Sequence, residues 1–250
     1  MLNETFYLDG IDARSAGIQL QAPIEFSEAV PVVEAQTIPG RNGDLIWETG
    51  SYENRSGSAS CFCLQKDVEK AISSAGRFLM GQKGYRRLET SDDPDHYWLA
   101  RVENSPQIAM RLRTLAPFEI GFDCKPQRFL KSGEQSIDLS AIYGNETHFS
   151  IYNQYGFESK PLIQIISNMT EEEPGSCYVS CNGRRCIVNR LINTIFLDSD
   201  TQNAYNEQGN QNMNISCKEF IVLEPGENDF AVFSAAGDIV VKIIPRWWEL

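Results

Sequence analysis

Apolar and polar residues alternate at a spacing of two along most of this chain, and this pattern constrains the fold more than any other sequence feature. In residues 56–64, for example, Ala59, Cys61 and Cys63 fall on one face, as in a strand with one buried side. Clusters of Gly, Pro and Asn separate the alternating runs, which is typical of turns between short strands. The sequence therefore predicts a mainly β fold.

One segment departs from this pattern. Residues 67–81, DVEKAISSAGRFLMG, place apolar side chains at helical spacing. Asp67 is suited to cap the first turn, because its carboxylate can accept from free backbone N–H groups. Gly81 or Gly84 would end the helix. We expect one amphipathic helix laid on a sheet.

A domain boundary is expected after the long alternating run of residues 108–122. There Cys124-Lys125-Pro126 interrupts the pattern, and proline ends regular pairing because it lacks the N–H donor. We predict that residues 1–126 form a β-sandwich or barrel-like domain with the single helix. Residues 127–250 are predicted to form an antiparallel β-sandwich, and the sequence leaves open whether the last strand joins this domain or returns to the first. With 250 residues, the chain can supply a core to each domain.

The second domain contains no convincing helical pattern. Its strands are expected at 149–152, 162–167, 177–179, 186–188, 193–198, 220–223, 229–233 and 239–244. Residues 200–214 are rich in Asn and Gln, and we expect them to form a long exposed loop.

The charge and apolar content of the chain bear on nucleic-acid and membrane partners. Its net charge is −12, which disfavours sequence-independent binding to nucleic-acid phosphates. No apolar run approaches the roughly 18–20 residues of a membrane span, so no membrane partner is expected. The N-terminus lacks the basic and apolar regions of a signal peptide, and we expect no secretion by that route.

The cysteines favour free thiols. There are seven, an odd number, and without an export signal reduced thiols in a bacterial cytoplasm are expected. Cys177, Cys181 and Cys186 are spaced as in some metal sites, but the nearby sequence offers only Cys217 as a fourth ligand. We expect no metal, and small buried residues in strands are the favoured interpretation.

No motif of catalysis is present. The two histidines, His96 and His148, are expected next to an acidic turn and at the start of a polar loop, away from any nucleophile motif. The sequence has no GxSxG, P-loop or HExxH. The acidic groups at 92–95 and 171–173 are expected to lie in solvated turns. We therefore predict no enzyme activity and no cofactor.

The chain ends on a conspicuous motif consisting of Pro245, Arg246, Trp247 and Trp248. Neighbouring residues of a strand point to opposite faces, so burial of both tryptophans needs two packed layers, or one layer and an interface. Core packing and an interface both remain open, and a platform for sugar stacking is a third interpretation.

Taken in order, several motifs of the chain resemble the phage distal tail (Dit) protein family. The resemblance rests on residues 38–45 (IPGRNGDL), 50–54 (GSYEN), the single helix, 84–88 (GYRRL), 98–103, 118–126 and the closing 245–248 (PRWW). It is most specific over residues 1–126.

The resemblance implies a fold and an assembly. It implies an N-terminal β domain with one helix, a C-terminal galectin-like sandwich, and six copies in a ring at the tail tip of a phage or prophage with a long non-contractile tail. The ring would connect the tail tube protein to the tail-associated hub or lysin protein, and DNA would pass through it without specific binding. Receptor-binding or side proteins could attach to the C-terminal domain. The protein would be made and assembled in the host cytoplasm and end in the virion.

Three hypotheses follow. The leading one is a structural ring subunit, with the turn Arg41, Asn42, Gly43 and Asp44 at a subunit contact. The second is a carbohydrate-binding module or adhesin for host saccharides, suggested by residues 200–214 and the terminal tryptophans. The third, a tail-associated hydrolase, is suggested by the acidic loops alone.

Overall fold

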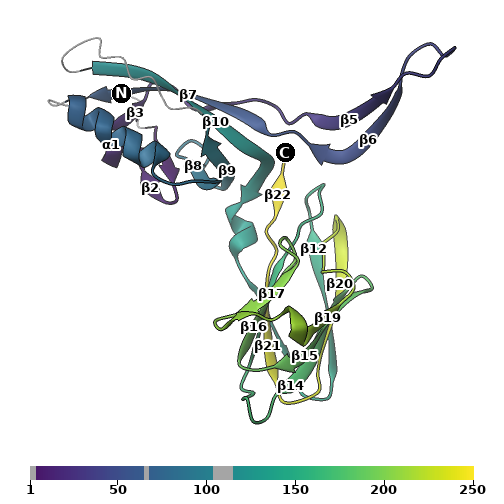
Figure 1. Ribbon diagram of the computed structural model, residues 1–250. Coiled ribbons are helices and arrows are strands. Elements are labelled where there is room, and N and C mark those ends of the chain that lie inside the picture. The colour runs from purple at the N-terminus through teal and green to yellow at the C-terminus, as the bar shows by residue number, and fades with distance from the viewer. Residues whose placement is uncertain (1–3, 65–67, 104–114) are drawn as a thin grey trace. The chain divides into compact units, whose positions relative to one another are not determined.

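The computed structural model describes residues 4–64, 68–103 and 115–250 (Figure 1). The chain forms two compact units, Met1–Arg128 together with Leu250, and Phe129–Glu249. Each unit has its own cluster of buried apolar side chains. The prediction of a mainly β protein with one α-helix is confirmed for the described residues.

The first unit is built on one large sheet with the strand order β2-β1-β8-β9-β10-β7-β3, and β4 also pairs with β7. The strands are β1 (Phe6–Leu8), β2 (Ile11–Asp12), β3 (Ile18–Leu20), β4 (Glu25–Phe26), β7 (Arg55–Leu64), β8 (Arg86–Thr90), β9 (His96–Val102) and β10 (Leu115–Leu130). As the alternation predicted, Ala59, Cys61 and Cys63 of β7 are at most 1% exposed.

The one α-helix of the described residues, α1, spans Val68–Met80. Ala71, Ala75 and Leu79 follow one another at a spacing of four and are all buried in the core of the first unit. The proposed N-cap, Asp67, lies outside the described residues. No helix in the described part of the chain has both the length and the apolar character needed to cross a membrane.

The expected interruption at Pro126 is wrong, because β10 continues through it to Leu130. The register explains why the proline is tolerated. Cys124 opposite Arg55 is the last pair that β10 makes with β7, so beyond it no β7 partner requires the missing N–H of Pro126.

A separate two-stranded sheet joins β5 (Pro31–Gln36) and β6 (Leu45–Tyr52) into a long hairpin (Figure 1). Almost all of its residues are exposed to solvent.

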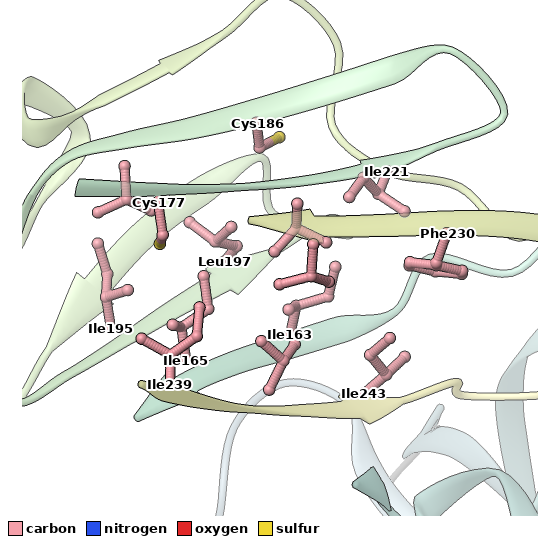
Figure 2. Close-up of a cluster of buried hydrophobic side chains, with 14 of the residues drawn as sticks. Ile163, Ile165, Cys177, Cys186, Ile195, Leu197, Ile221, Phe230, Ile239 and Ile243 are labelled. Carbon is pink, nitrogen blue, oxygen red and sulfur yellow. The ribbon is translucent and has the colours of Figure 1, made fainter. Parts of the chain in front are cut away.

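The second unit consists of two sheets, with the orders β11-β21-β13-β16-β17-β18 and β12-β20-β14-β15-β19. The strands are β11 (Ile137–Ala141), β12 (Glu146–Asn153), β13 (Leu162–Ser167), β14 (Gly175–Cys181), β15 (Arg184–Leu191), β16 (Thr194–Asp198), β17 (Asn203–Asn206), β18 (Gly209–Asn210), β19 (Ile215–Cys217), β20 (Gly226–Ser234) and β21 (Ile239–Ile244). Figure 2 shows side chains of both sheets meeting, among them Ile165 of β13, Ile243 of β21 and Phe230 of β20. The predicted antiparallel sandwich is thus present.

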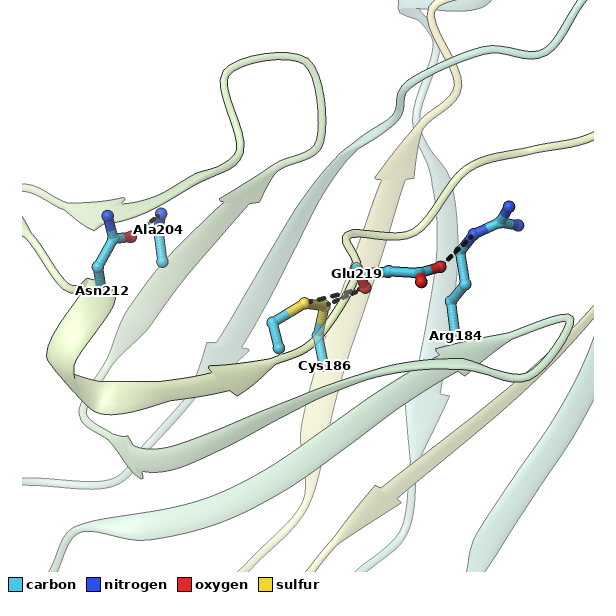
Figure 3. Close-up of a disulfide and its surroundings, with 6 residues drawn as sticks. Arg184, Cys186, Ala204, Asn212 and Glu219 are labelled. Atoms are coloured by element: carbon cyan, nitrogen blue, oxygen red, sulfur yellow. Dashed lines mark hydrogen bonds and ion pairs between the residues drawn. A yellow bond between two sulfur atoms is a disulfide. The ribbon is translucent and has the colours of Figure 1, made fainter.

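The Asn-rich segment is not the long loop that its composition predicted. It forms β17, β18 and a short 3₁₀ helix η3 (Asn212–Asn214), and β19 follows directly. Side-chain amides hold these pieces together; for example, Asn212 Oδ1 accepts from the backbone N of Ala204 at 2.6 Å (Figure 3). Such local bonds let polar residues order a segment without a continuous apolar pattern.

The strand expected at 220–223 is also absent from the described fold. These residues are irregular apart from one bridge, in which Leu223 pairs with Ser159. Ile221 and Leu223 are nevertheless buried, which accounts for the apolar signal in the sequence.

Candidate interaction surfaces and a polar cavity

The turn predicted as a subunit contact forms the tip of the β5–β6 hairpin, and its residues Arg41, Asn42, Gly43 and Asp44 are all exposed. Thr37 Oγ1 donates to Asp44 Oδ1 at 2.8 Å across the base of the turn. Gly40 and Gly43 both have a φ of +81°, in the left-handed region that glycine enters without steric cost. The turn is therefore shaped by its own residues.

Large apolar side chains lie on both faces of this hairpin. Ile46 is 63% exposed, Trp47 58% and Val33 50%. Ile46 and Trp47 are neighbours on β6 and so point to opposite faces. A two-stranded sheet is marginally stable in water by itself, and exposed apolar surface of this kind marks contact with a partner. The hairpin is the strongest candidate interaction surface of the first unit.

The closing motif is held within the second unit. The guanidinium of Arg246 donates to Asp198 Oδ1 at 2.6 Å, and Ser159 Oγ donates to the carbonyl oxygen of Pro245 at 2.8 Å. Burial raises the pKa of Asp198, but the hydrogen bonds and charge of Arg246 outweigh it and hold that pKa below its usual value.

The two tryptophans of the motif contact different neighbours. Trp247 packs against the core of the second unit, near the ring of Tyr155. Trp248 donates its indole N–H to the carbonyl oxygen of Glu158 at 2.8 Å and stacks on Phe157 at 4.5 Å. Both side chains are half-buried. Intramolecular packing thus accounts for the motif, and an additional interface role stays a prediction.

The expectation that all seven cysteines are free thiols is wrong for one pair. Cys186 of β15 and Cys217 of β19 are joined by a disulfide (Figure 3). The strand register places them directly opposite each other, with Cα atoms 4.3 Å apart, which brings the sulfur atoms within bonding reach. Sequence spacing alone does not show such cross-strand neighbours.

The remaining five cysteines are free and buried. Burial raises the pKa of Cys61, Cys124, Cys177 and Cys181 to about 12. Thiols with such values are not ionised near neutral pH, so they lack the thiolate that acts as a nucleophile or metal ligand. Among the described residues no group of three or more His, Cys, Asp or Glu converges as metal ligands would.

The acidic turn before β9 is more than a solvated loop. Asp93 Oδ1 and His96 Nδ1 are 2.7 Å apart, and the guanidinium of Arg128 also pairs with Asp93. Burial raises the pKa of Asp93, but its bonds to His96 and Arg128 outweigh this and lower it. This cluster of hydrogen bonds and ion pairs stabilises the first unit.

The second histidine lies elsewhere than expected. His148 is part of β12 rather than of a loop, and its side chain is 70% exposed. On the same outer face, Arg185 lies over the ring of Tyr178 at 4.2 Å, and Tyr178 donates to Glu146 at 2.7 Å. These polar and aromatic groups lie together on the exposed face of the sheet.

A small polar cavity of about 160 Å³ lies elsewhere in the second unit. Its walls come from the turn after β13, from β15 and β16, and from the Asn-rich segment. It is lined by Glu171, Arg190, Ile192, Thr194, Ile195, Asn206, Gln208, Gln211 and Asn214. Sequence reasoning singled out the Asn-rich segment but missed Arg190, because no local pattern marks it.

Comparisons with known proteins bear on the fold. No protein-family model matches the chain, and no curated protein matches it. The crystal structure of the Dit protein (gp 19.1) of phage SPP1 matches with a TM-score of 0.68 at 14% identity, over 96% of this chain and 98% of that one. That structure is described as a paradigm of the hub adsorption apparatus in phages that infect Gram-positive bacteria. At this identity the match shows a shared fold, here over nearly the whole of both chains.

A second solved structure is only weakly similar. The mosquito-larvicidal Cry4Aa toxin of Bacillus thuringiensis has a TM-score of 0.26 at 10% identity, over 62% of this chain and 30% of that one.

Proposed function

We propose that this protein is a structural subunit of a phage tail tip and that six copies form a ring there. The observation that carries the proposal is the SPP1 Dit-like fold over 96% of the chain. In this role the ring connects the tail tube protein to a tail-associated hub or lysin protein and lets DNA pass. The protein acts as a structural part of the virion and not as an enzyme.

The exposed hairpin supplies a physical basis for assembly. A closed ring needs a contact between two different faces of the same subunit, so that each copy joins the next. Burying Ile46 and Trp47 against a neighbouring copy would remove apolar surface from water on both faces of the hairpin. Within the proposed ring, the hairpin therefore makes the contact between subunits, with the turn Arg41–Asp44 at its tip.

The charge of the chain fits a passage for DNA. A net charge of −12 gives no general attraction to phosphates, and DNA would slide past such a surface without sticking. Receptor-binding or side proteins would attach to the second unit, as the family resemblance implies.

The first experiment is light scattering over a range of concentrations. Six copies of 28.2 kDa make about 169 kDa, and we expect this mass or twice it for stacked rings. A protein that stays monomeric at all concentrations, and also in the presence of its tail tube protein, would contradict the proposal.

The hairpin contact is tested by Ile46→Ser combined with Trp47→Ser. We expect this variant to stay folded, because both side chains are exposed in the single chain, and to lose the ring. The control is Ile142→Ser with Tyr152→Ser, two side chains of the second unit that are 61% and 70% exposed. If both variants form rings equally well, the subunit contact lies elsewhere.

A further inference from the structure

One wall of the polar cavity of the second unit, formed by the Asn-rich segment, is fixed by its own hydrogen bonds. Asn206 Oδ1 accepts from the backbone N of Gln208 at 2.9 Å and from Gln211 Nε2 at 3.0 Å. Asn214 Nδ2 in turn donates to Gln211 Oε1 at 2.6 Å. Because these amides already orient one another, a ligand would not have to order them on binding.

The segment that carries these amides is also held from outside the cavity. Asn212 bonds to the backbone of Ala204 on one side, and the disulfide from Cys217 to Cys186 ties the following strand to β15 on the other (Figure 3). The wall is therefore anchored at both of its ends, as expected for a preformed binding site.

The cavity also presents hydrogen-bonding groups that the protein itself leaves unused. In the described part of the chain, no ion pair or hydrogen bond occupies the Arg190 guanidinium or the Glu171 carboxylate, and none occupies Asn206 Nδ2 or the side-chain amide of Gln208. Three of these groups are donors or carry donors, while Glu171 accepts only. A ligand that satisfies them needs both donors and acceptors.

The charges select a neutral ligand. An anion attracted by Arg190 would meet Glu171 in the same cavity, and a cation attracted by Glu171 would meet Arg190. A hydroxyl group both donates and accepts, so a ligand with several adjacent hydroxyls can bond to both charged groups and to the amides.

We propose that this cavity binds a neutral saccharide and that it accommodates about one sugar unit. Arg190, Glu171, Asn206 and Gln211 contact the sugar hydroxyls. Among the residues that the structure describes, no aromatic ring lines the cavity, and its volume is about 160 Å³. The affinity for a single sugar is therefore weak, with a Kd of about 1 mM or above. Many copies in one assembly would strengthen attachment to a polymer, but binding to a single copy does not depend on ring formation.

Saturation-transfer NMR on the full chain tests the proposal, because it detects weak ligands at any protein size. The panel consists of glucose, galactose, rhamnose, N-acetylglucosamine and N-acetylgalactosamine. At least one sugar should show saturable binding, while glucosamine and glucose 6-phosphate bind less well than neutral glucose does. If no sugar of the panel binds at a concentration of roughly 50 times the expected Kd of about 1 mM, the proposal is wrong. Preferential binding of glucose 6-phosphate would also overturn it, in favour of an anion site.

Variants locate the site. Arg190→Ala and Glu171→Gln should each weaken binding about tenfold, without lowering the melting temperature, because neither side chain has an ion-pair partner in the described structure. The matched control is Arg185→Ala, which removes an exposed arginine of the same strand β15 from the outer face. Loss of binding with Arg185→Ala but not with Arg190→Ala would move the site to that face and overturn the assignment. Since ring mass is measured separately, failure here leaves the proposed assembly untouched.

Discussion

At the scale of single residues, one buried amide closes the turn before β20. Asn228 is 0% exposed; its Nδ2 donates to the carbonyl oxygen of Glu224 at 2.8 Å, and its Oδ1 accepts from the backbone N of Glu224 at 2.8 Å. Asn228→Ala would remove these hydrogen bonds together with those that Nδ2 donates to the carbonyl oxygens of Ile151 and Gly226, and would leave a gap where the buried amide lies. We therefore expect the free energy of unfolding to fall by about 2–4 kcal/mol. Urea unfolding followed by tryptophan fluorescence measures the loss.

The control for this variant is Asn189→Ala. Asn189 is exposed and bonds only to Ser216 Oγ in the described structure, so its removal should cost less than about 0.5 kcal/mol. Equal losses for the two variants would contradict the role given to the buried amide.

A second residue-scale prediction concerns pH. The pKa of Asp198 is below its usual value of 3.8, with burial opposing and Arg246 favouring the ionised form. A lowered pKa in the folded state stabilises the fold above the unfolded pKa, and this contribution is lost as pH falls through the folded value. Asp198→Asn should therefore be less stable than the natural chain at pH 7, and the difference should shrink below about pH 4. If the difference in free energy of unfolding between the two proteins stays constant in urea titrations down to about pH 2.5, the prediction is wrong. The control is Asp229→Asn, at an exposed site on β20.

At the scale of elements, the strand pair β15–β19 determines the number of free thiols. With Cys186 and Cys217 bonded, five cysteines remain free. Iodoacetamide should therefore add five groups to the unfolded chain without reductant and seven after reduction, as measured by intact mass. In the folded chain the thiols whose pKa is raised to about 12 should react far more slowly at pH 8. Seven additions without reductant would show that the pair is reduced, as the composition had indicated.

Elements with a regular apolar period were predictable from the sequence. The helical spacing of Ala71, Ala75 and Leu79 gave α1, and the alternation along 56–64 gave β7. Two of the local signals that failed did so because hydrogen bonding decides the structure there. Pro126 lies beyond the last pair with β7, and Asn212 replaces apolar contacts with a bond to the backbone of Ala204.

The candidate sites also differ in whether the sequence alone could reveal them. The turn Arg41–Asp44 was visible because Gly and Asn mark turns locally. The cavity was not, because Arg190 and Glu171 lie far apart in sequence and meet only when β15 and the turn after β13 come together. The pairing of Cys186 with Cys217 likewise depends on strand register, which spacing along the chain does not encode.

At the scale of the whole molecule, the two units have separate cores. A unit with its own core can in principle fold alone, so a fragment of residues 129–250 should unfold cooperatively. The hairpin with its exposed Ile46 and Trp47 belongs to the first unit. If it makes the ring contact, the fragment 129–250 should be monomeric while the full chain assembles.

Light scattering on the fragment and on the full chain, under the same conditions, shows which of the two units makes the ring contact. A monomeric, folded fragment beside a full chain of about six copies would assign the ring contact to residues 1–128. A fragment that itself assembles into rings would contradict the role of the hairpin, because the closing contact would then lie within the sandwich. The saccharide measurement can be repeated on the same fragment, since every residue lining the cavity is within it. Binding by a monomeric fragment would show that one unit recognises sugar while the other assembles.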